Sequence, residues 1–343
     1  MKELLTISLA VLAFIACSKS NIPNENRAET AIAFGEPETR AEITDKNQIL
    51  KFGVFADKNT GDPGSEGASQ FTDFLFTDEE VFRSEESKDW DYVNKQYWIY
   101  DREYHFFAYY PYTKNVERKT ITENQVDTDV YQIPFTTPAN ADTDLLTAYV
   151  HVSTNSNDPN FEGIPEYVNF SFNHALAKIC VTVAKNGAND GDRIVVTSVS
   201  FSGIKKSGVY NCHRHANTNE WILSDGNETG TFSMNNLDAE LPAGVNGIAV
   251  MGDKGMLLIP QTTSSVNIAI KYEFYNYNNT TGNYEYAYAN TIESPLPAGE
   301  WLPSKSYNYK INLAAEENEI LFGTPTITDW GSEKQVGGNI IIQ

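Results

Sequence analysis

Cys17 is the residue whose position most clearly indicates chemistry. It follows a short charged start at residues 1–3 and an almost unbroken apolar run over residues 4–15. This run is too short to cross a bilayer as a helix, but it suits the core of a secretory signal peptide. A cysteine directly after a small residue, here Ala16, is what bacterial lipoprotein processing needs, because its thiol accepts the diacylglycerol. The sequence therefore predicts a lipoprotein signal peptide over residues 1–17, ending at a lipidated Cys17.

The other reactive residue types form no catalytic or metal-binding pattern. No Gly-x-Ser-x-Gly pentapeptide occurs, and no Ser/His/Asp triad can be proposed. The run Cys212-His213-Arg214-His215 is too short for its side chains to converge on one ion, and a fourth ligand is not evident. The acidic turns at 142–144 and 190–192 lack the full ligand set of a calcium loop. His174 lies among apolar neighbours, and this position favours a structural role for its side chain. We therefore expect no enzyme activity, no cofactor and no metal.

Composition limits the partners of the chain. Lys and Arg number 25 against 46 Asp and Glu, which leaves a formal net charge of -21. Such a surface repels nucleic acid and anionic lipid head groups, so neither is expected to bind. Beyond Cys17, only Cys180 and Cys212 remain, and an oxidising compartment permits but does not require a disulfide between them.

The side chains discussed above must be positioned by short strands that are separated by turn residues. The chain is rich in aromatic residues, with 19 Tyr and 18 Phe, and no segment has a helix-length amphipathic pattern. We therefore predict an all-β fold of two tandem antiparallel β-sandwich domains, over residues 41–188 and 189–343. The expected strands after the first forty residues are 49–56, 71–76, 95–100, 104–110, 144–152, 167–172, 174–184, 193–201, 209–211, 221–223, 247–251, 255–260, 266–275, 284–292 and 306–313.

The two ends of the chain have distinct patterns. Residues 18–40 begin as a polar tether and continue into an alternating strand, in which Ile32 and Phe34 share one face. A polar joint follows at residues 38–42. At the other end, residues 320–343 contain a second apolar stretch and, directly before Gln343, three isoleucines that are costly to leave in water. We expect this tail to pair with a sheet, either in its own domain or in another molecule.

Several of these patterns, taken together, resemble the fimbrillins, the pilus subunits of Bacteroidales type V fimbriae. The matching features are spread over nearly the whole chain: the lipoprotein cysteine, the strand ending in Phe34-Gly35, the joint Thr39-Arg40-Ala41, the strand Phe52-Gly53-Val54-Phe55, the run Phe170-Ser171-Phe172-Asn173-His174-Ala175-Leu176-Ala177-Lys178-Ile179, the segment Tyr307-Asn308-Tyr309-Lys310-Ile311, and Trp330-Gly331. The resemblance implies transthyretin-like β-sandwiches.

The resemblance also implies a route of assembly. An arginine-specific protease would cut between Arg40 and Ala41, and so release the lipid together with the first strand, whose residues are Ala31, Ile32, Ala33 and Phe34. The vacated groove would accept the carboxy-terminal segment of a neighbouring subunit, which here contains Ile327, Trp330, Ile340, Ile341 and Ile342. The implied partners are other copies or paralogues of pilus subunits, the outer membrane through the lipid of the precursor, and a host or bacterial surface ligand. The implied location is the cell outer membrane and then an extracellular fimbrium that supports adhesion.

Two alternatives remain open from the sequence. Arg27 is also followed by alanine, and a cut there would spare the first strand and only detach the lipid. Shaft, tip and anchor subunits are not distinguished. A surface lipoprotein that binds glycans is the main rival function, because residues 97–98, 109–112 and 272–277 contain clustered aromatic side chains that suit sugar rings.

Overall fold

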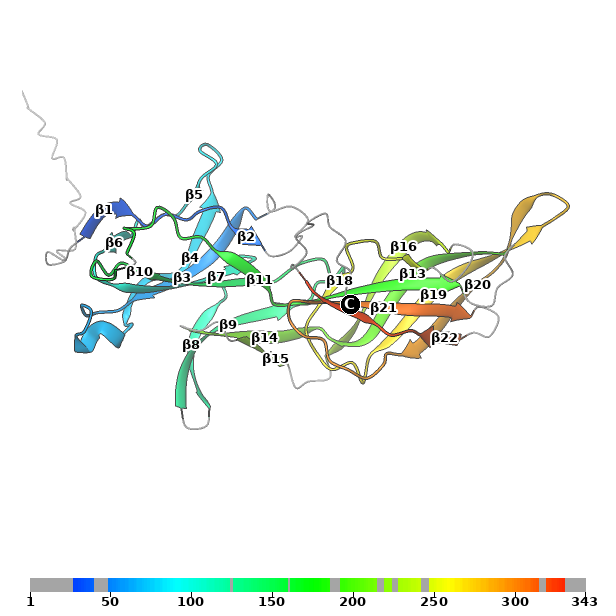
Figure 1. The fold of residues 1–343 in the computed structure, drawn as a ribbon. Coiled ribbons are helices and arrows are strands. Elements are labelled where there is room, and N and C mark those ends of the chain that lie inside the picture. Colours follow the sequence, from blue (N-terminus) through cyan, green and yellow to red (C-terminus); the bar gives the residue numbers. More distant parts are fainter. Residues whose placement is uncertain are drawn as a thin grey trace, which may run out of the picture.

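The computed structural model describes residues 27–39, 49–123, 126–159, 161–185, 192–214, 219–223, 228–241, 247–314 and 319–330. Within these ranges the chain is built from β-strands, with one short 3-10 helix, η2 (Glu66–Ser69). No helix in the described part is long and apolar enough to cross a membrane. The molecule is elongated, with its amino-terminal and carboxy-terminal halves placed end to end (Figure 1). The predicted all-β fold class is confirmed.

The amino-terminal half contains a seven-stranded sheet and a separate strand pair. All neighbouring strands of the sheet are antiparallel except β11 and β2, which are parallel. Aromatic and aliphatic side chains of both sheets form one core. In spatial order the sheet contains β2 (Glu38–Thr39), β11 (Ser171–His174), β10 (Leu146–Ser153), β7 (Glu103–Tyr110), β3 (Lys51–Lys58), β4 (Asp73–Arg83) and β5 (Trp90–Asp91), and the pair is β1 (Arg27–Ala31) with β6 (Tyr97–Ile99).

The carboxy-terminal half has two sheets that enclose a second core. Its strands alternate as a half-buried sheet requires: in β12, Ile179, Val181 and Val183 are fully buried, while the residues between them are partly exposed. One sheet has the order β17 (Ile248–Ala249), β12 (Ala177–Lys185), β21 (Lys305–Ala314) and β22 (Glu319–Phe322). In this sheet β18 (Met256–Leu258) also pairs with β12, and β23 (Thr326–Asp329) also pairs with β21. The other sheet has the order β16 (Thr229–Glu240), β13 (Arg193–Lys205), β19 (Asn267–Asn278) and β20 (Asn283–Pro295).

A four-stranded sheet, the middle sheet, lies between the two halves and contains strands from both. Its order is β15 (Asn219–Leu223), β14 (Ser207–His213), β9 (Val126–Thr136) and β8 (Glu117–Glu123). A third core lies against this sheet, where the Tyr131 ring stacks on Phe107 with 4.6 Å between ring centroids. Because β9 pairs with β14, and β12 pairs with β21, hydrogen-bonded strands cross the boundary predicted at residue 188. The sheets therefore do not divide at that position, and the transthyretin-like layout stays a prediction.

Candidate functional site

The segment 27–39 lies along the outside of the amino-terminal half, where it runs from β1 to β2 (Figure 1). β1 pairs antiparallel with β6, and β2 is the outermost strand of the seven-stranded sheet. Between them, the Val168 N–H donates to the Ala33 carbonyl at 2.8 Å, and the Gly35 N–H donates to the Val168 carbonyl at 3.1 Å. The regular strand ends at Ala31 and is followed by an isolated bridge from Phe34 to Val168. The residues predicted as the first strand thus belong to an edge segment.

This edge segment inserts apolar side chains into the core. Ile32 is 1% exposed and Phe34 is 2% exposed, as their alternation in the sequence predicts. The Phe34 ring stacks on Phe170 with 5.8 Å between centroids and makes an edge contact with Phe52 at 6.2 Å. Removal of the segment would therefore open a slot lined by aromatic rings.

A buried hydroxyl holds the segment from the body side. The Tyr92 hydroxyl donates to the Ile32 carbonyl at 2.7 Å and accepts from the Gln96 N–H at 3.1 Å. Burial is the main cause that raises the pKa of Tyr92 above its ordinary value. The Ile32 N–H in turn donates to the Gln96 carbonyl at 2.8 Å. The backbone of Ile32 is therefore satisfied on both sides by groups that belong to the rest of the domain.

Gly35 allows the segment to pass close to its neighbour. A Cβ atom at this position would lie only 2.0 Å from the Asn169 Oδ1 atom and 3.3 Å from the Tyr167 Cβ atom. Any other residue here requires the Asn169 side chain to turn away. The Phe34-Gly35 pair thus combines a deep aromatic anchor with a close backbone approach.

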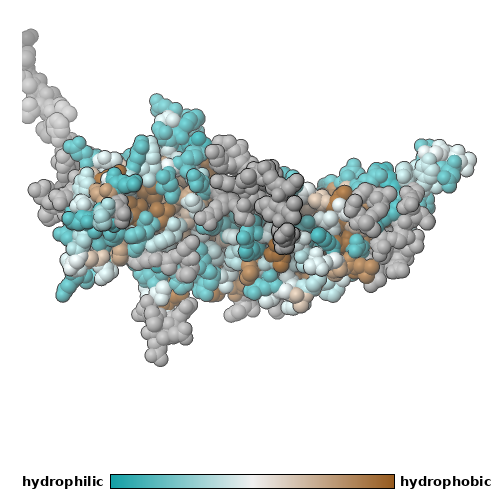
Figure 2. All heavy atoms as spheres, in the orientation of Figure 1, coloured by the Kyte–Doolittle hydropathy of each residue, from teal (hydrophilic) through white to brown (hydrophobic). Residues whose placement is uncertain are grey.

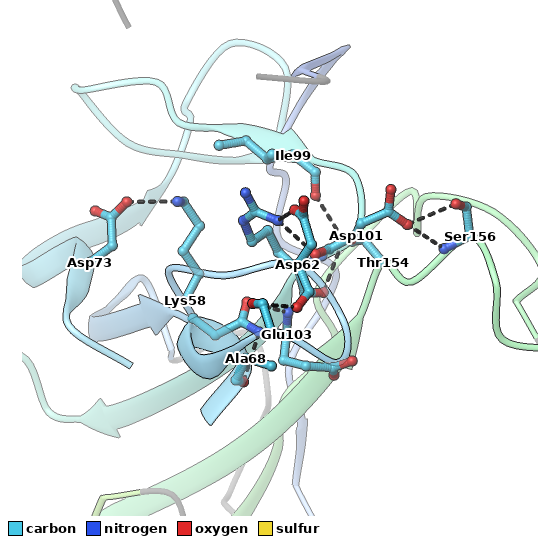
Figure 3. Close-up of polar contacts among 12 residues, drawn as sticks. Lys58, Asp62, Ala68, Asp73, Ile99, Asp101, Glu103, Thr154 and Ser156 are labelled. Carbon is cyan, nitrogen blue, oxygen red and sulfur yellow. Dashed lines mark hydrogen bonds and ion pairs between the residues drawn. The ribbon is translucent and has the colours of Figure 1, made fainter. Parts of the chain in front are cut away.

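The strand that receives β1 is held to the body independently of β1. The Tyr104 hydroxyl bonds both to the N–H and to the carbonyl of Ile99, at 2.8 Å and 3.2 Å. Figure 3 shows the Thr154 side chain beside Ile99, and its hydroxyl donates to the same carbonyl at 2.7 Å. Just beyond this strand, the Asp101 N–H donates to the Thr154 carbonyl at 2.9 Å, and the Ser153 hydroxyl joins β10 to Glu103 of β7 at 2.7 Å. β6 therefore remains supported when β1 is absent.

The predicted processing residues lie at the two ends of this segment or outside the described residues. Arg27 is the first residue of β1, and its backbone pairs with Ile99. β2 ends at Thr39, so Arg40 and Ala41 follow directly and fall outside the described residues, as does Cys17. A cut after residue 40 would separate the whole edge segment from the body, whereas a cut after Arg27 would leave nearly all of it in place.

The carboxy-terminal strands β22 and β23 lie on their own domain. Both pair antiparallel with β21, where Leu313 faces Ile320 and Tyr307 faces Ile327. Ile320 is buried in the carboxy-terminal core, whereas Ile327 is 57% exposed at the edge of the sheet. Of the two possibilities left open for the tail, residues 319–330 thus show the folded-back arrangement. Residues 340–342 lie outside the described residues.

Trp330 anchors the end of this folded-back part. Its ring stacks on His174 with 3.4 Å between centroids and 11° between the planes. The Nδ1 atom of His174 lies 2.5 Å from an Asp144 carboxylate oxygen, and both side chains are almost fully buried. Burial raises the pKa of Asp144, while the histidine lowers it to a smaller extent. The Trp330 N–H donates to the Ser304 carbonyl at 2.8 Å, so ring and backbone are both held.

Comparison with known proteins identifies the family. The sequence model of the fimbrillin-like family matches residues 39–330, which is most of the chain. The chain belongs to the fimbrillin-like family. Comparison of this fimbrillin-like chain with curated proteins gives no match.

Solved structures show the same fold at low identity. A fimbrial protein from Bacteroides vulgatus has a TM-score of 0.58 and 19% identity, covering 89% of this fimbrillin-like chain and 100% of its own. A candidate cell adhesion protein from Bacteroides ovatus has a TM-score of 0.50 and 18% identity, covering 89% and 99%. The resemblance to fimbrillins that the sequence indicated is thus confirmed.

Among the residues considered as metal ligands, Asp144 is paired with His174 in this fimbrillin-like protein. In the run that begins at Cys212, the described polar contacts belong to Arg214. Arg214 bonds to Asp57 at 2.9 Å and to Asp129 at 2.6 Å, and so joins β14 to β3 and β9. Cys212 is buried beside it, and Cys180 and Cys212 are both free. His174 is hydrogen-bonded and buried, as its neighbours predict. His215 lies outside the described residues.

Sequence reasoning missed the residues that surround the edge segment. Tyr92, Val168 and Tyr104 contact or support it, yet they lie far from it in the sequence. Their alternation marked Val168 and Tyr104 as strand residues. No local signal could assign them to this particular partner, because edge pairing depends on the tertiary fold.

Proposed function

We propose that this fimbrillin-like protein is a structural subunit of a cell-surface fimbria that polymerises by β-strand exchange and supports adhesion. Proteolysis after Arg40 releases residues 17–40 with the lipid on Cys17, and the vacated groove accepts the carboxy-terminal segment of the next subunit. The cut turns a monomer into a polymer-forming subunit, because an open groove presents unpaired backbone groups and apolar walls.

The position of Ile32 and Phe34 supports this proposal most directly. Both side chains are buried, yet they belong to a segment at the edge of its sheet. Their burial stabilises the occupied groove by roughly 3–6 kcal/mol in total, before the cost of ordering the chain. An incoming strand that buries similar side chains regains that free energy. A single exchanged strand is therefore sufficient for a durable contact between subunits.

The lipid fits the same scheme. Cys17 would carry a palmitate-type anchor that holds the precursor in the outer membrane before the cut. Processing after Arg40 separates this anchor from the body together with the edge segment. The mature subunit then belongs to the extracellular fimbrium, and its contacts are with other subunits and with a host or bacterial surface.

The test is polymer formation after proteolysis. The purified full-length protein, kept in detergent, is incubated with an arginine-specific protease and analysed by electrophoresis without boiling. We expect a ladder of bands that collapses to one band on boiling. The Arg40→Gln variant should stay monomeric, because its edge segment is not released.

The Arg27→Gln variant is the matched control, and it should form the same ladder as the parent protein. Loss of the ladder in this variant, with a normal ladder from Arg40→Gln, would place processing at Arg27 and rule out strand release. A protein that is cut after Arg40 and remains monomeric at high concentration would contradict polymerisation.

Glycan binding is a second candidate function, and one surface favours it. Trp98, Tyr109 and Tyr272 are fully buried, so core packing accounts for much of the predicted aromatic platforms. The hairpin of β19 and β20 differs, because it projects beyond the carboxy-terminal half (Figure 1) and its surface is hydrophilic to neutral (Figure 2). Tyr277 and Tyr284 form an exposed edge-to-face pair there, 5.3 Å apart. Polysaccharide binding without any ladder would favour this function over assembly.

A further inference from the structure

The edge segment places its buried side chains at an uneven spacing. Ala28, Ile32 and Phe34 enter the amino-terminal core, separated by four and then two residues. Glu29 and Thr30, between the first two, are exposed. Irregular pairing between β1 and β6 accompanies the longer step. An incoming strand that fills the same three places needs apolar residues at the same spacing.

The last thirteen residues of the chain repeat this spacing. In residues 331–343, Val336, Ile340 and Ile342 are separated by four and then two residues. Gly337 and Gly338 fall on the places of the exposed Glu29 and Thr30, where no side chain is required to pack.

The spacing fixes a direction as well as a register. A strand that entered in the opposite direction would need apolar residues spaced by two and then four, and residues 331–343 contain no such set. In the matching direction Gln343 falls on the place of Gly35, where the Asn169 side chain must turn to admit a Cβ atom. In this register the tail would follow the path of the edge segment as far as the place of Gly35.

Residues 319–330 are already committed to their own domain. β22 and β23 together pair eight of their residues with β21, and Ile320 is buried in the carboxy-terminal core. Trp330 closes this part by stacking on the buried His174. Donation of the whole segment 320–343 would break these contacts, whereas donation of the residues after Trp330 breaks none of them.

We propose that the donated segment begins after Trp330, and that Val336, Ile340 and Ile342 take the places of Ala28, Ile32 and Phe34 in the next subunit. β22 and β23 stay on the donor, and Trp330 fixes the point where the tail leaves it. This inference rests on the proposed function, since it specifies the partner segment of the same groove.

A covalent lock on β23 tests where the donated segment begins. Lys305 and Asp329 are directly paired residues of β21 and β23, and their exposed side chains form an ion pair. The double variant Lys305→Cys with Asp329→Cys brings two cysteines within disulfide distance at this pair. The oxidised and reduced forms of this full-length variant are treated with protease beside the parent protein. We expect both forms to give the ladder of the parent.

Each outcome of the lock is decisive. An oxidised variant that stays monomeric, while its reduced form makes the ladder, shows that β23 must leave its own domain and overturns the proposal. Absence of a ladder from the parent protein itself would instead refute the proposed function. Equal ladders from the locked, reduced and parent proteins support a donated segment that starts after Trp330.

Three single substitutions in the tail test the register. Ile340→Asp and Ile342→Asp place a charge on the face that enters the groove, so the ladder should be lost. Ile341→Asp is the matched control, because alternate side chains of a strand point to opposite faces, and it should retain the ladder. Thermal unfolding of the uncut variants should match that of the parent, which separates a defect in exchange from a defect in folding.

The opposite pattern would contradict the register. If Ile341→Asp abolishes the ladder while Ile340→Asp and Ile342→Asp retain it, the tail enters with its other face inward. If all three substitutions retain the ladder, these isoleucines do not enter the groove at all. Either result overturns the assignment to Ala28, Ile32 and Phe34.

Discussion

At the residue scale, Phe34 anchors the edge segment in the amino-terminal core. Its ring lies within 6.5 Å of the Phe52, Phe76, Tyr92, Phe106 and Phe170 rings, centroid to centroid. The Phe34→Ala substitution should lower the unfolding free energy of the uncut protein by about 3–5 kcal/mol, because it leaves a cavity among these rings. Guanidinium unfolding followed by fluorescence measures this change.

Ile327→Ala is the control for this prediction. Ile327 is 57% exposed, so its truncation should change the unfolding free energy by less than about 0.5 kcal/mol. If the two substitutions have equal effects, Phe34 does not anchor the segment in solution.

The hydrogen bond from Tyr92 makes the attachment of the edge segment depend on pH. Its hydroxyl donates to the Ile32 carbonyl, so Tyr92→Phe should cost about 1 kcal/mol of unfolding free energy at pH 7. Burial raises the pKa of Tyr92 above the ordinary 10.0, so the contribution of the hydroxyl is fully present below pH 10 and is lost as the pH rises through the folded-state pKa. The difference between parent and variant should shrink in urea titrations above pH 10. A difference that grows there would contradict the assigned hydrogen bond.

At the element scale, patterned strands could be predicted and unpatterned ones could not. The strand expected at residues 266–275 is found as β19, and alternation also located Ile32 and Phe34 on one buried face. β8 was missed because its sequence ERKTITE contains a single apolar residue. β16 was missed because half of its residues are exposed and only Phe232 is buried. Such strands form because a neighbour supplies their hydrogen bonds, and one sequence does not show which neighbour that is.

The sequence likewise predicts only part of the candidate site. The buried face of the edge segment follows from local alternation, so the sequence predicts which of its side chains enter a core. Its partners, β6 and the strand region around Val168, follow only from the tertiary fold. The stack of Trp330 on His174 likewise joins residues that no periodic pattern relates.

At the scale of the whole molecule, the middle sheet joins the two halves into one structure. Tyr131 of β9 packs on Phe55 and Phe107 from the amino-terminal half, while β14 pairs along β9 from the other side. Arg214 adds ion pairs to Asp57 and Asp129, and Asp57 is fully buried. Turn composition around residue 188 indicated a boundary there, but a turn between two strands has the same composition whether or not a domain ends at it.

This joining predicts how fragments behave. Residues 41–188 and residues 189–343, produced separately, should each fail to show cooperative thermal unfolding, because β9 loses β14 and β12 loses β21. Ile179 and Val181 of β12, both fully buried in the whole protein, would then face water. Co-expression of the two fragments should restore a folded complex, since both pairings can form again between chains. Two fragments that each unfold cooperatively alone would show that the halves are independent and that the middle sheet only connects them.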